Sequence, residues 1–177
     1  MQNGITLAIT MTVILVLIGI LLTILINVFI MPTSQTPRKI VKEIIDKMHL
    51  KKKDKLADLG CGDGRIITEA YKTSKCTCVG YDLSPIMVIL AKIGTKATSP
   101  FTKNVTLDVQ DIFKMDISDC TKVYCYLNDG TLKLMKQKLS TFIKNGGEVY
   151  SYKYRIAGIK KYTEEKLSNG DVLYIYK

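Results

Sequence analysis

The stretch LADLGCGDGRI, residues 56–66, is the starting point for the fold of this chain. Residues 55–59 are mostly apolar and predict a short buried strand, and residues 65–72 place apolar side chains on one face of a helix. Three glycines alternate between these two elements, namely Gly60, Gly62 and Gly64. Because glycine lacks a Cβ atom, it permits a tight turn and close approach of a ligand to the backbone. A strand, a glycine turn and a helix together predict the first unit of a nucleotide-binding α/β fold.

Acidic residues flank and interrupt this turn. The spacing is G-x-G-x-G rather than the dinucleotide fingerprint G-x-G-x-x-G, and Asp58 precedes it. Asp63 lies inside the turn, where we expect its charge to repel a pyrophosphate. Arg65 is expected to position the loop or to pair with Asp63. This pattern favours S-adenosylmethionine, which carries an ammonium and a sulfonium and no phosphate, over a turn that binds nothing.

Two further acids follow strand-like runs. Asp82 ends the run 76–81, about 20 residues beyond the turn, where a carboxylate can accept hydrogen bonds from ribose hydroxyls. Asp82 and Ser84 also suit the N-terminus of a helix predicted over about 85–93, so a capping role is an alternative for Asp82. Asp111 follows the predicted strand 105–110 and could meet an adenine amino group, with a surface loop acid as the alternative.

Taken together, the motifs DLGCGDGRI and YDLSP resemble class I S-adenosylmethionine-dependent methyltransferases. The flanks narrow the resemblance to the small protein-lysine methyltransferases typified by the mitochondrial ATP synthase c-subunit lysine methyltransferase, with adenine-nucleotide-translocase and archaeal relatives. These flanks are MPTSQTPRKIVKEII before the first strand, and VYCYLNDGTLKLMKQKL and NGGEVYSYKY after it. The resemblance covers about residues 31–160. The last core motif of that family commonly ends in glycine-tryptophan, whereas this chain contains no Trp.

The resemblance and the pattern of elements imply one architecture. It is an α/β, Rossmann-like, seven-stranded class I methyltransferase fold whose sheet is mostly parallel. Further strands are predicted at 122–127 and 148–154, and Asn169-Gly170 predicts a C-terminal antiparallel hairpin. The expected cofactor-binding residues for S-adenosylmethionine are Asp58, Gly60, Cys61, Gly62, Gly64, Asp82, Leu83, Asp111 and Ile112.

An apolar segment precedes this domain. Residues 4–31 contain no charged residue, and a membrane span needs about 20 apolar residues. A cleaved signal peptide would begin with basic residues, whereas the first charge here is Arg38. We therefore expect one N-terminal transmembrane helix in an anchor (1–31), then a linker and pre-domain helix (32–54) and the methyltransferase domain (55–177). Thr36 and Pro37 are expected to start the pre-domain helix, with Thr36 as its cap.

Charge suggests how the domain faces the membrane. The net charge is +10, and every charged residue lies from Arg38 onward. The positive-inside rule predicts a single-pass protein with its catalytic domain on the cytoplasmic side, or on the matrix side in a mitochondrion. The anchor favours attraction to anionic lipid headgroups over nucleic-acid binding as the role of this charge, and a Lys-rich solvated surface is an equally open alternative. Five cysteines and a single histidine, His49, predict reduced thiols in the core and no metal site.

The acceptor side of the site is expected after the fourth and fifth strands. The candidates are Tyr126, Asn128, Ser151 and Tyr152, since a tyrosine hydroxyl or an asparagine carbonyl can accept a hydrogen bond from an attacking amine. Aromatic packing is the alternative for Tyr126 and Tyr152. The predicted function is a membrane-anchored protein-lysine N-methyltransferase that acts on a membrane or membrane-proximal protein, with no nucleic-acid partner. The alternatives are a methyltransferase for a lipid, quinone-like or other small molecule, an RNA methyltransferase, and a non-catalytic membrane assembly factor.

Overall fold

The computed structural model describes residues 2–29, 35–100 and 102–177. The chain divides into two compact units, residues 1–33 and 34–177. The first unit contains the helix α1 (Gln2–Phe29). Its segment Gly4–Ile24 has a mean hydropathy of 2.8 and no part of it is buried, so its length and composition fit a membrane span.

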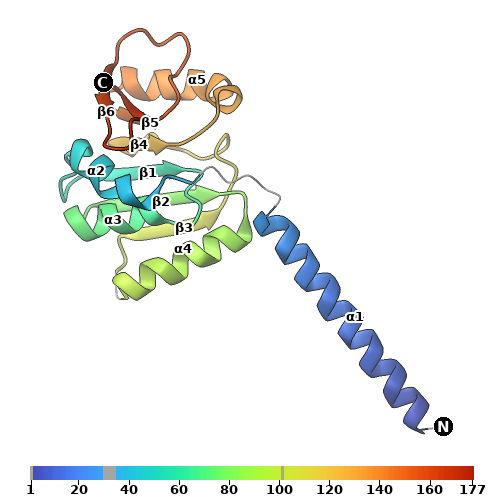
Figure 1. The fold of residues 1–177 in the computed structure, drawn as a ribbon. Helices are drawn as coiled ribbons and strands as arrows, with labels where there is room; N and C mark the ends of the chain where they lie inside the picture. The colour runs from blue at the N-terminus through green and yellow to red at the C-terminus, as the bar shows by residue number, and fades with distance from the viewer. Residues whose placement is uncertain (1, 30–34, 101) are drawn as a thin grey trace. The chain divides into compact units, whose positions relative to one another are not determined.

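The second unit is built on one seven-stranded sheet, which lies between helices in Figure 1. The strand order is β3-β2-β1-β4-β5-β7-β6. The strands are β1 (Lys55–Leu59), β2 (Thr77–Asp82), β3 (Val105–Val109), β4 (Lys122–Cys125), β5 (Glu148–Tyr152), β6 (Thr163–Lys166) and β7 (Val172–Tyr176). Neighbouring strands from β3 to β5 are parallel, and β7 runs antiparallel to both β5 and β6. The predicted fold and its C-terminal hairpin are therefore confirmed.

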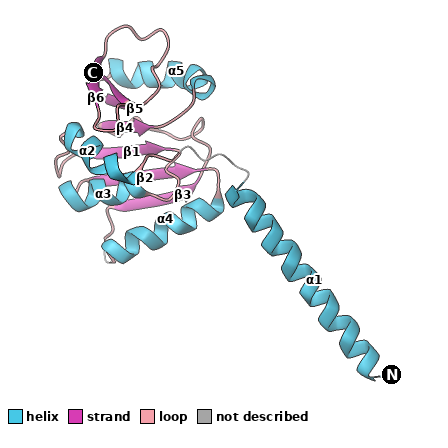
Figure 2. Ribbon diagram, viewed as in Figure 1, coloured by secondary structure: helices cyan, strands magenta, loops and turns pink. Residues whose placement is uncertain are grey.

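Helices cover both faces of this sheet, as Figure 2 shows. The four helices are α2 (Arg38–Met48), α3 (Arg65–Ser74), α4 (Pro85–Thr98) and α5 (Asp129–Lys144). Helices α2, α3 and α4 share one core cluster with Tyr124 and Tyr150, whereas α5 shares the other with Val123 and Val149. Tyrosine and valine alternate because successive strand side chains point to opposite faces.

Four local predictions differ from the structure. Thr36 does not cap α2; its hydroxyl is hydrogen-bonded to the hydroxyl of Tyr124 at 2.6 Å in the core, and Pro37 occupies the cap position. Strand β4 ends at Cys125, two residues before the predicted boundary, and β5 ends at Tyr152. Helix α4 continues to Thr98, beyond the predicted end at residue 93, because Ala91 and Thr95 remain buried against the core.

Candidate active site

The glycine turn lies at the carboxyl end of β1, in the middle of the sheet. The backbone N–H groups of Gly60 and Cys61 both donate to the carbonyl of Tyr81 at the end of β2, at 2.9 and 3.0 Å. All three glycines have positive φ angles, and a Cβ atom on Gly64 would lie 2.8 Å from the Cβ of Ala91. The turn therefore requires glycine for its backbone conformation and for its contact with α4.

Asp82 connects this turn to α4. Its Oδ2 atom accepts a hydrogen bond from the backbone N–H of Gly62 at 2.9 Å, and its Oδ1 atom accepts one from Ser84 at 2.9 Å. Ser84, rather than Asp82, is the N-cap of α4, and Pro85 is its first residue. The carboxylate of Asp82 thus holds the end of β2, the glycine turn and the start of α4 in one arrangement.

Asp58 is a buried acid directly before the turn. It is 2 % exposed and lies in register with Tyr124 of β4. Burial raises its pKa to about 8, and the charges of Asp82 and Asp63 add to this shift. Within the described part of the chain, no group donates a hydrogen bond to this carboxylate. A negative charge at this largely buried position would be complementary to a cationic ligand, which fits the ammonium and sulfonium of S-adenosylmethionine.

Asp63 is not the free negative charge expected from the sequence. Its carboxylate binds Arg65 through two hydrogen bonds, at 2.7 and 2.8 Å, and lies 3.3 Å from Arg38. Burial by itself raises the pKa of Asp63, but the bonds to Arg65 outweigh it, and the pKa is lowered. The expected pairing of Arg65 with Asp63 is confirmed, and the repulsion argument is corrected because Arg65 neutralises the acid.

Arg65 has a second role that the sequence did not reveal. Its guanidinium donates to the carbonyl of Thr36 at 2.6 Å and to the side chain of Gln35. These contacts hold the segment before α2 against the glycine turn. The partners are about 30 residues apart in the chain, so no local pattern pointed to them.

The loop after β3 brings the third acid to the same edge of the sheet. The N–H of Gln110 donates to the carbonyl of Asp82 at 3.1 Å, and Asp111 Oδ1 accepts from the N–H of Phe113 at 2.9 Å. Ile112 is buried, whereas Leu83 is 65 % exposed. Ligands of open α/β sheets bind beyond the carboxyl ends of the strands, where Asp58, Asp82 and Asp111 all lie.

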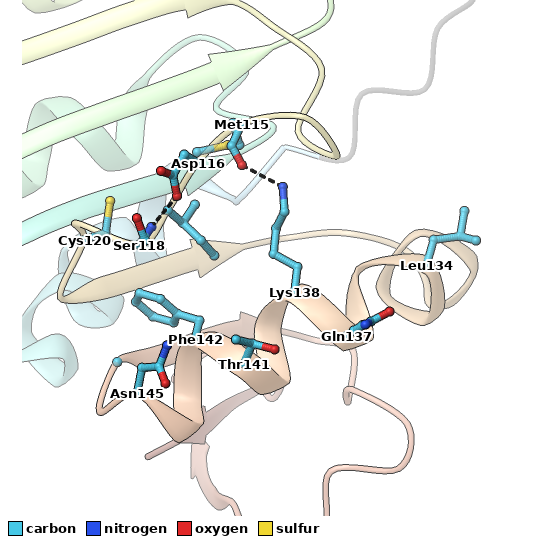
Figure 3. Close-up of a pocket in the computed structure, with 12 residues that line it drawn as sticks. Met115, Asp116, Ser118, Cys120, Leu134, Gln137, Lys138, Thr141, Phe142 and Asn145 are labelled. Carbon is cyan, nitrogen blue, oxygen red and sulfur yellow. Dashed lines mark hydrogen bonds between the residues drawn. The ribbon is translucent and has the colours of Figure 1, made fainter.

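Lys138 of α5 holds this loop from the other side. Its ammonium donates to the carbonyls of Ile112, Phe113 and Met115 at 3.1, 2.7 and 2.7 Å. Figure 3 shows Lys138 beside a pocket of about 500 Å³ between α5 and residues 115–120. This pocket lies on the α5 side of the sheet and does not include the glycine turn.

The segment after β4 lies beside the glycine turn. A Cβ atom on Gly60 would be 3.6 Å from the side chain of Leu127. The ring of the preceding Tyr126 packs edge-on against Tyr152 at 4.7 Å and is stacked with Tyr154 at 6.1 Å between ring centroids. Tyr126 is half-buried, and no described residue is hydrogen-bonded to its hydroxyl.

The other three acceptor candidates are engaged in the fold, and the hydroxyl of the buried Tyr152 donates to the carboxylate of Asp171. Asn128 is exposed at the N-cap of α5, and its Oδ1 atom accepts a hydrogen bond from Thr131 at 2.9 Å. Ser151 is fully buried, and its hydroxyl donates to the carbonyl of Tyr154 at 2.6 Å. Their contacts position the two segments that carry Tyr126 and Tyr154.

Comparison with known proteins identifies the family. A model of the ANTKMT methyltransferase domain matches residues 58–163, which contain the glycine turn, all three acids and Tyr126. This chain belongs to the ANTKMT methyltransferase family. It is 30 % identical over 152 residues to a protein-lysine N-methyltransferase of Saccharolobus islandicus, covering 82 % of this chain and 92 % of that protein. It is 31 % identical over 100 residues to the adenine nucleotide translocase lysine N-methyltransferase of Mus musculus, covering 56 % of this chain and 43 % of that protein.

A solved structure supports the cofactor assignment. The RNA methyltransferase of Salinibacter ruber, in complex with S-adenosyl-L-homocysteine, superposes with a TM-score of 0.70 at 25 % identity. The match covers 81 % of this chain and 92 % of that one. The chain is therefore an S-adenosylmethionine-dependent methyltransferase, and the buried acid beside its glycine turn suits that cofactor.

Proposed function

We propose that this ANTKMT-family chain is a membrane-anchored protein-lysine N-methyltransferase that acts on a membrane or membrane-proximal protein. The observation that carries the proposal is the similarity to a protein-lysine N-methyltransferase over 92 % of that protein's length. The hydrophobic α1 supports the anchor. The basic residues that follow it from Arg38 favour a domain on the cytoplasmic side, or on the matrix side in a mitochondrion.

The proposal assigns cofactor binding to the three acids and the glycine turn, and acceptor binding to the tyrosines after β4 and in and after β5. S-adenosylmethionine supplies an activated methyl group when bound. The carboxylates of Asp58, Asp82 and Asp111 and the glycine turn would hold the cofactor at the carboxyl edge of the sheet. The hydroxyl of Tyr126 would accept a hydrogen bond from the lysine amine and orient it. The aromatic rings of Tyr152 and Tyr154 would exclude water, which lowers the pKa of the amine and favours its neutral, nucleophilic form.

The proposal is tested by transfer of a radiolabelled methyl group from S-adenosylmethionine. Purified full-length protein is incubated with membranes from cells that lack it, alongside the Asp82→Ala variant. Asp116→Ala is the matched control, because Asp116 makes a similar hydrogen bond to Ser118 at 2.8 Å outside the site. A labelled protein band that persists with Asp116→Ala and is lost with Asp82→Ala is the expected result. Mass spectrometry of that band then locates the modified lysine.

An RNA acceptor is the second candidate. It is favoured by the similarity to the Salinibacter ruber RNA methyltransferase and by the net charge of +10. The same assay separates the candidates. Label that ribonuclease removes supports an RNA acceptor, and label in the organic extract supports a lipid or quinone-like acceptor. Cofactor binding without any label would support the non-catalytic assembly factor.

A further inference from the structure

Helix α4 exposes an apolar face that none of the described residues 35–100 and 102–177 covers. Ile89, Leu90 and Ile93 are 55 %, 47 % and 61 % exposed, and these three residues form the α4 apolar face. The opposite side of the helix buries Met87, Val88, Ala91 and Thr95 against the sheet. A surface helix of a soluble domain normally places polar residues toward water. Helix α4 instead exposes apolar residues on the side that does not pack against the sheet.

Basic residues border this face. Lys92 and Lys96 lie on α4 itself and are both exposed, and Lys92 is paired with the exposed Asp108 of β3 at 3.4 Å. A groove of about 500 Å³ adjoins α4 at Gly94 and Thr98 and runs between α2 and α3. Four basic and two acidic residues line that groove: Arg38, Lys42, Arg65, Lys72, Asp63 and Glu69. Because the basic residues outnumber the acidic ones, the groove carries a net positive charge beside the α4 apolar face.

We propose that the α4 apolar face docks on the surface of an anionic lipid bilayer. An apolar helix face bordered by lysines is the pattern of helices that lie in the membrane interface, with their apolar side chains about 5–10 Å into the headgroup and acyl boundary. Basic residues near an anionic surface strengthen this attraction. A second copy of the chain is a poorer partner, because a symmetric contact would place the Lys92 and Lys96 borders of both copies together.

This contact would also orient the active site. The start of α4 is joined to the glycine turn through Asp82, and Ala91 of α4 contacts Gly64. A bilayer bound to α4 would therefore hold the carboxyl edge of the sheet at a fixed height above the lipid. The inference rests on the proposed membrane anchoring and adds a second, peripheral contact that selects acceptors near the membrane surface.

The absence of Trp from the chain makes a direct test possible. The full-length Ile93→Trp variant carries a single fluorophore on the α4 apolar face. Leu134→Trp is the matched control, because Leu134 is 73 % exposed on α5, which covers the other face of the sheet. Both variants are reconstituted into vesicles of phosphatidylglycerol whose acyl chains are brominated near the headgroup. Leu90→Trp replaces Ile93→Trp if the latter does not bind S-adenosylmethionine.

The expected result is a roughly twofold loss of Ile93→Trp fluorescence and no loss for Leu134→Trp, since interfacial side chains reach the acyl boundary. Equal fluorescence loss in the two variants would overturn the docking proposal. A blue-shifted but unquenched Ile93→Trp would also overturn it, because a protein would then cover the face. Equal quenching in brominated phosphatidylcholine would overturn the requirement for anionic lipid. Failure of the full chain to float with vesicles would overturn both the docking and the anchoring.

Discussion

Among single residues, Asp58 links the stability of the fold to pH. Its pKa in the folded protein is about 8, above the ordinary value of 3.8. Between these two pH values the folded state retains a proton that the unfolded state has lost. The contribution of Asp58 to stability is therefore present below pH 3.8 and is lost as the pH rises through 8. A cationic ligand beside this carboxylate would favour the ionised form and offset that loss.

Asp58→Asn is expected to separate these two effects. The amide cannot ionise, so the free energy of unfolding at pH 8 should rise by more than about 1 kcal/mol and depend less on pH between 4 and 8. Affinity for S-adenosylmethionine should fall about tenfold or more, because the buried charge that complements the ligand is lost. Urea unfolding across this pH range and titration calorimetry measure both quantities. An Asp58→Asn variant that binds the cofactor as tightly as the native chain would contradict the role of Asp58.

Gly64→Ala is expected to destabilise the fold. The φ angle of Gly64 is +73°, and its added Cβ would lie 2.8 Å from the Cβ of Ala91 and 3.2 Å from its Cα. We expect a loss of about 1–3 kcal/mol from the backbone strain, with the steric clash adding to it. Gly94→Ala is the control, because it lies in α4 with no atom within 4 Å of its Cβ position. That variant should stabilise the protein by about 0.5–1 kcal/mol. Melting temperatures that shift in the same direction for both variants would refute the prediction.

At the level of whole elements, the segment just before α2 is hydrogen-bonded to Arg65, the first residue of α3, which follows the glycine turn. Arg65 donates to the carbonyl of Thr36 and to both carboxylate oxygens of Asp63. The hydroxyl of Thr36 in turn meets Tyr124 of β4. The start of α2, the turn and the central strands are thus parts of one hydrogen-bonded network.

Arg65→Ala is expected to release this segment. It removes the bonds to Thr36 and leaves Asp63 without its main partner, at a cost of about 1–3 kcal/mol. Hydrogen exchange should become faster at the amides of residues 38–41, and affinity for S-adenosylmethionine should fall as the turn loosens. Arg155→Ala is the control, because the guanidinium of Arg155 donates a hydrogen bond to the hydroxyl of Tyr162 in the C-terminal region, away from the glycine turn. Unchanged exchange at the start of α2 in Arg65→Ala would show that other contacts hold the segment.

For the whole molecule, the proposed function depends on a membrane-inserted α1. Two lysines near the middle of the helix, Leu15→Lys and Ile18→Lys, should each oppose insertion by about 2.5–3.5 kcal/mol. The double variant is expected to leave the membrane pellet on alkaline carbonate extraction, whereas the native chain stays in it. The matched control, Leu15→Val with Ile18→Val, preserves apolar character and should remain in the pellet. Extraction of the native chain by carbonate would exclude the anchor.

Much of the fold was predictable because its signals are local. The strand before the glycine turn, the turn itself and the helix after it follow from hydrophobic period and from the backbone freedom of glycine. The Asn169-Gly170 hairpin and the start of α4, with Ser84 as its N-cap and Pro85 as its first residue, follow from short-range backbone chemistry. The order of acids after three successive strands also placed Asp58, Asp82 and Asp111 at one edge, because parallel strands bring their carboxyl ends together.

The remaining features depend on residues that are distant in the sequence and adjacent in space. Thr36 and Tyr124 are 88 residues apart, and their hydrogen bond replaced the helix cap that the local pattern predicted for Thr36. Asp63 became a neutralised partner of Arg65 and Arg38, and the pKa of Asp58 rose because folding removed water from around it. The sequence also did not predict the exposed apolar side of α4, because isoleucine and leucine in a helix are usually buried in the core. Burial and long-range pairing are properties of the packed chain, and a linear pattern of residue types does not contain them.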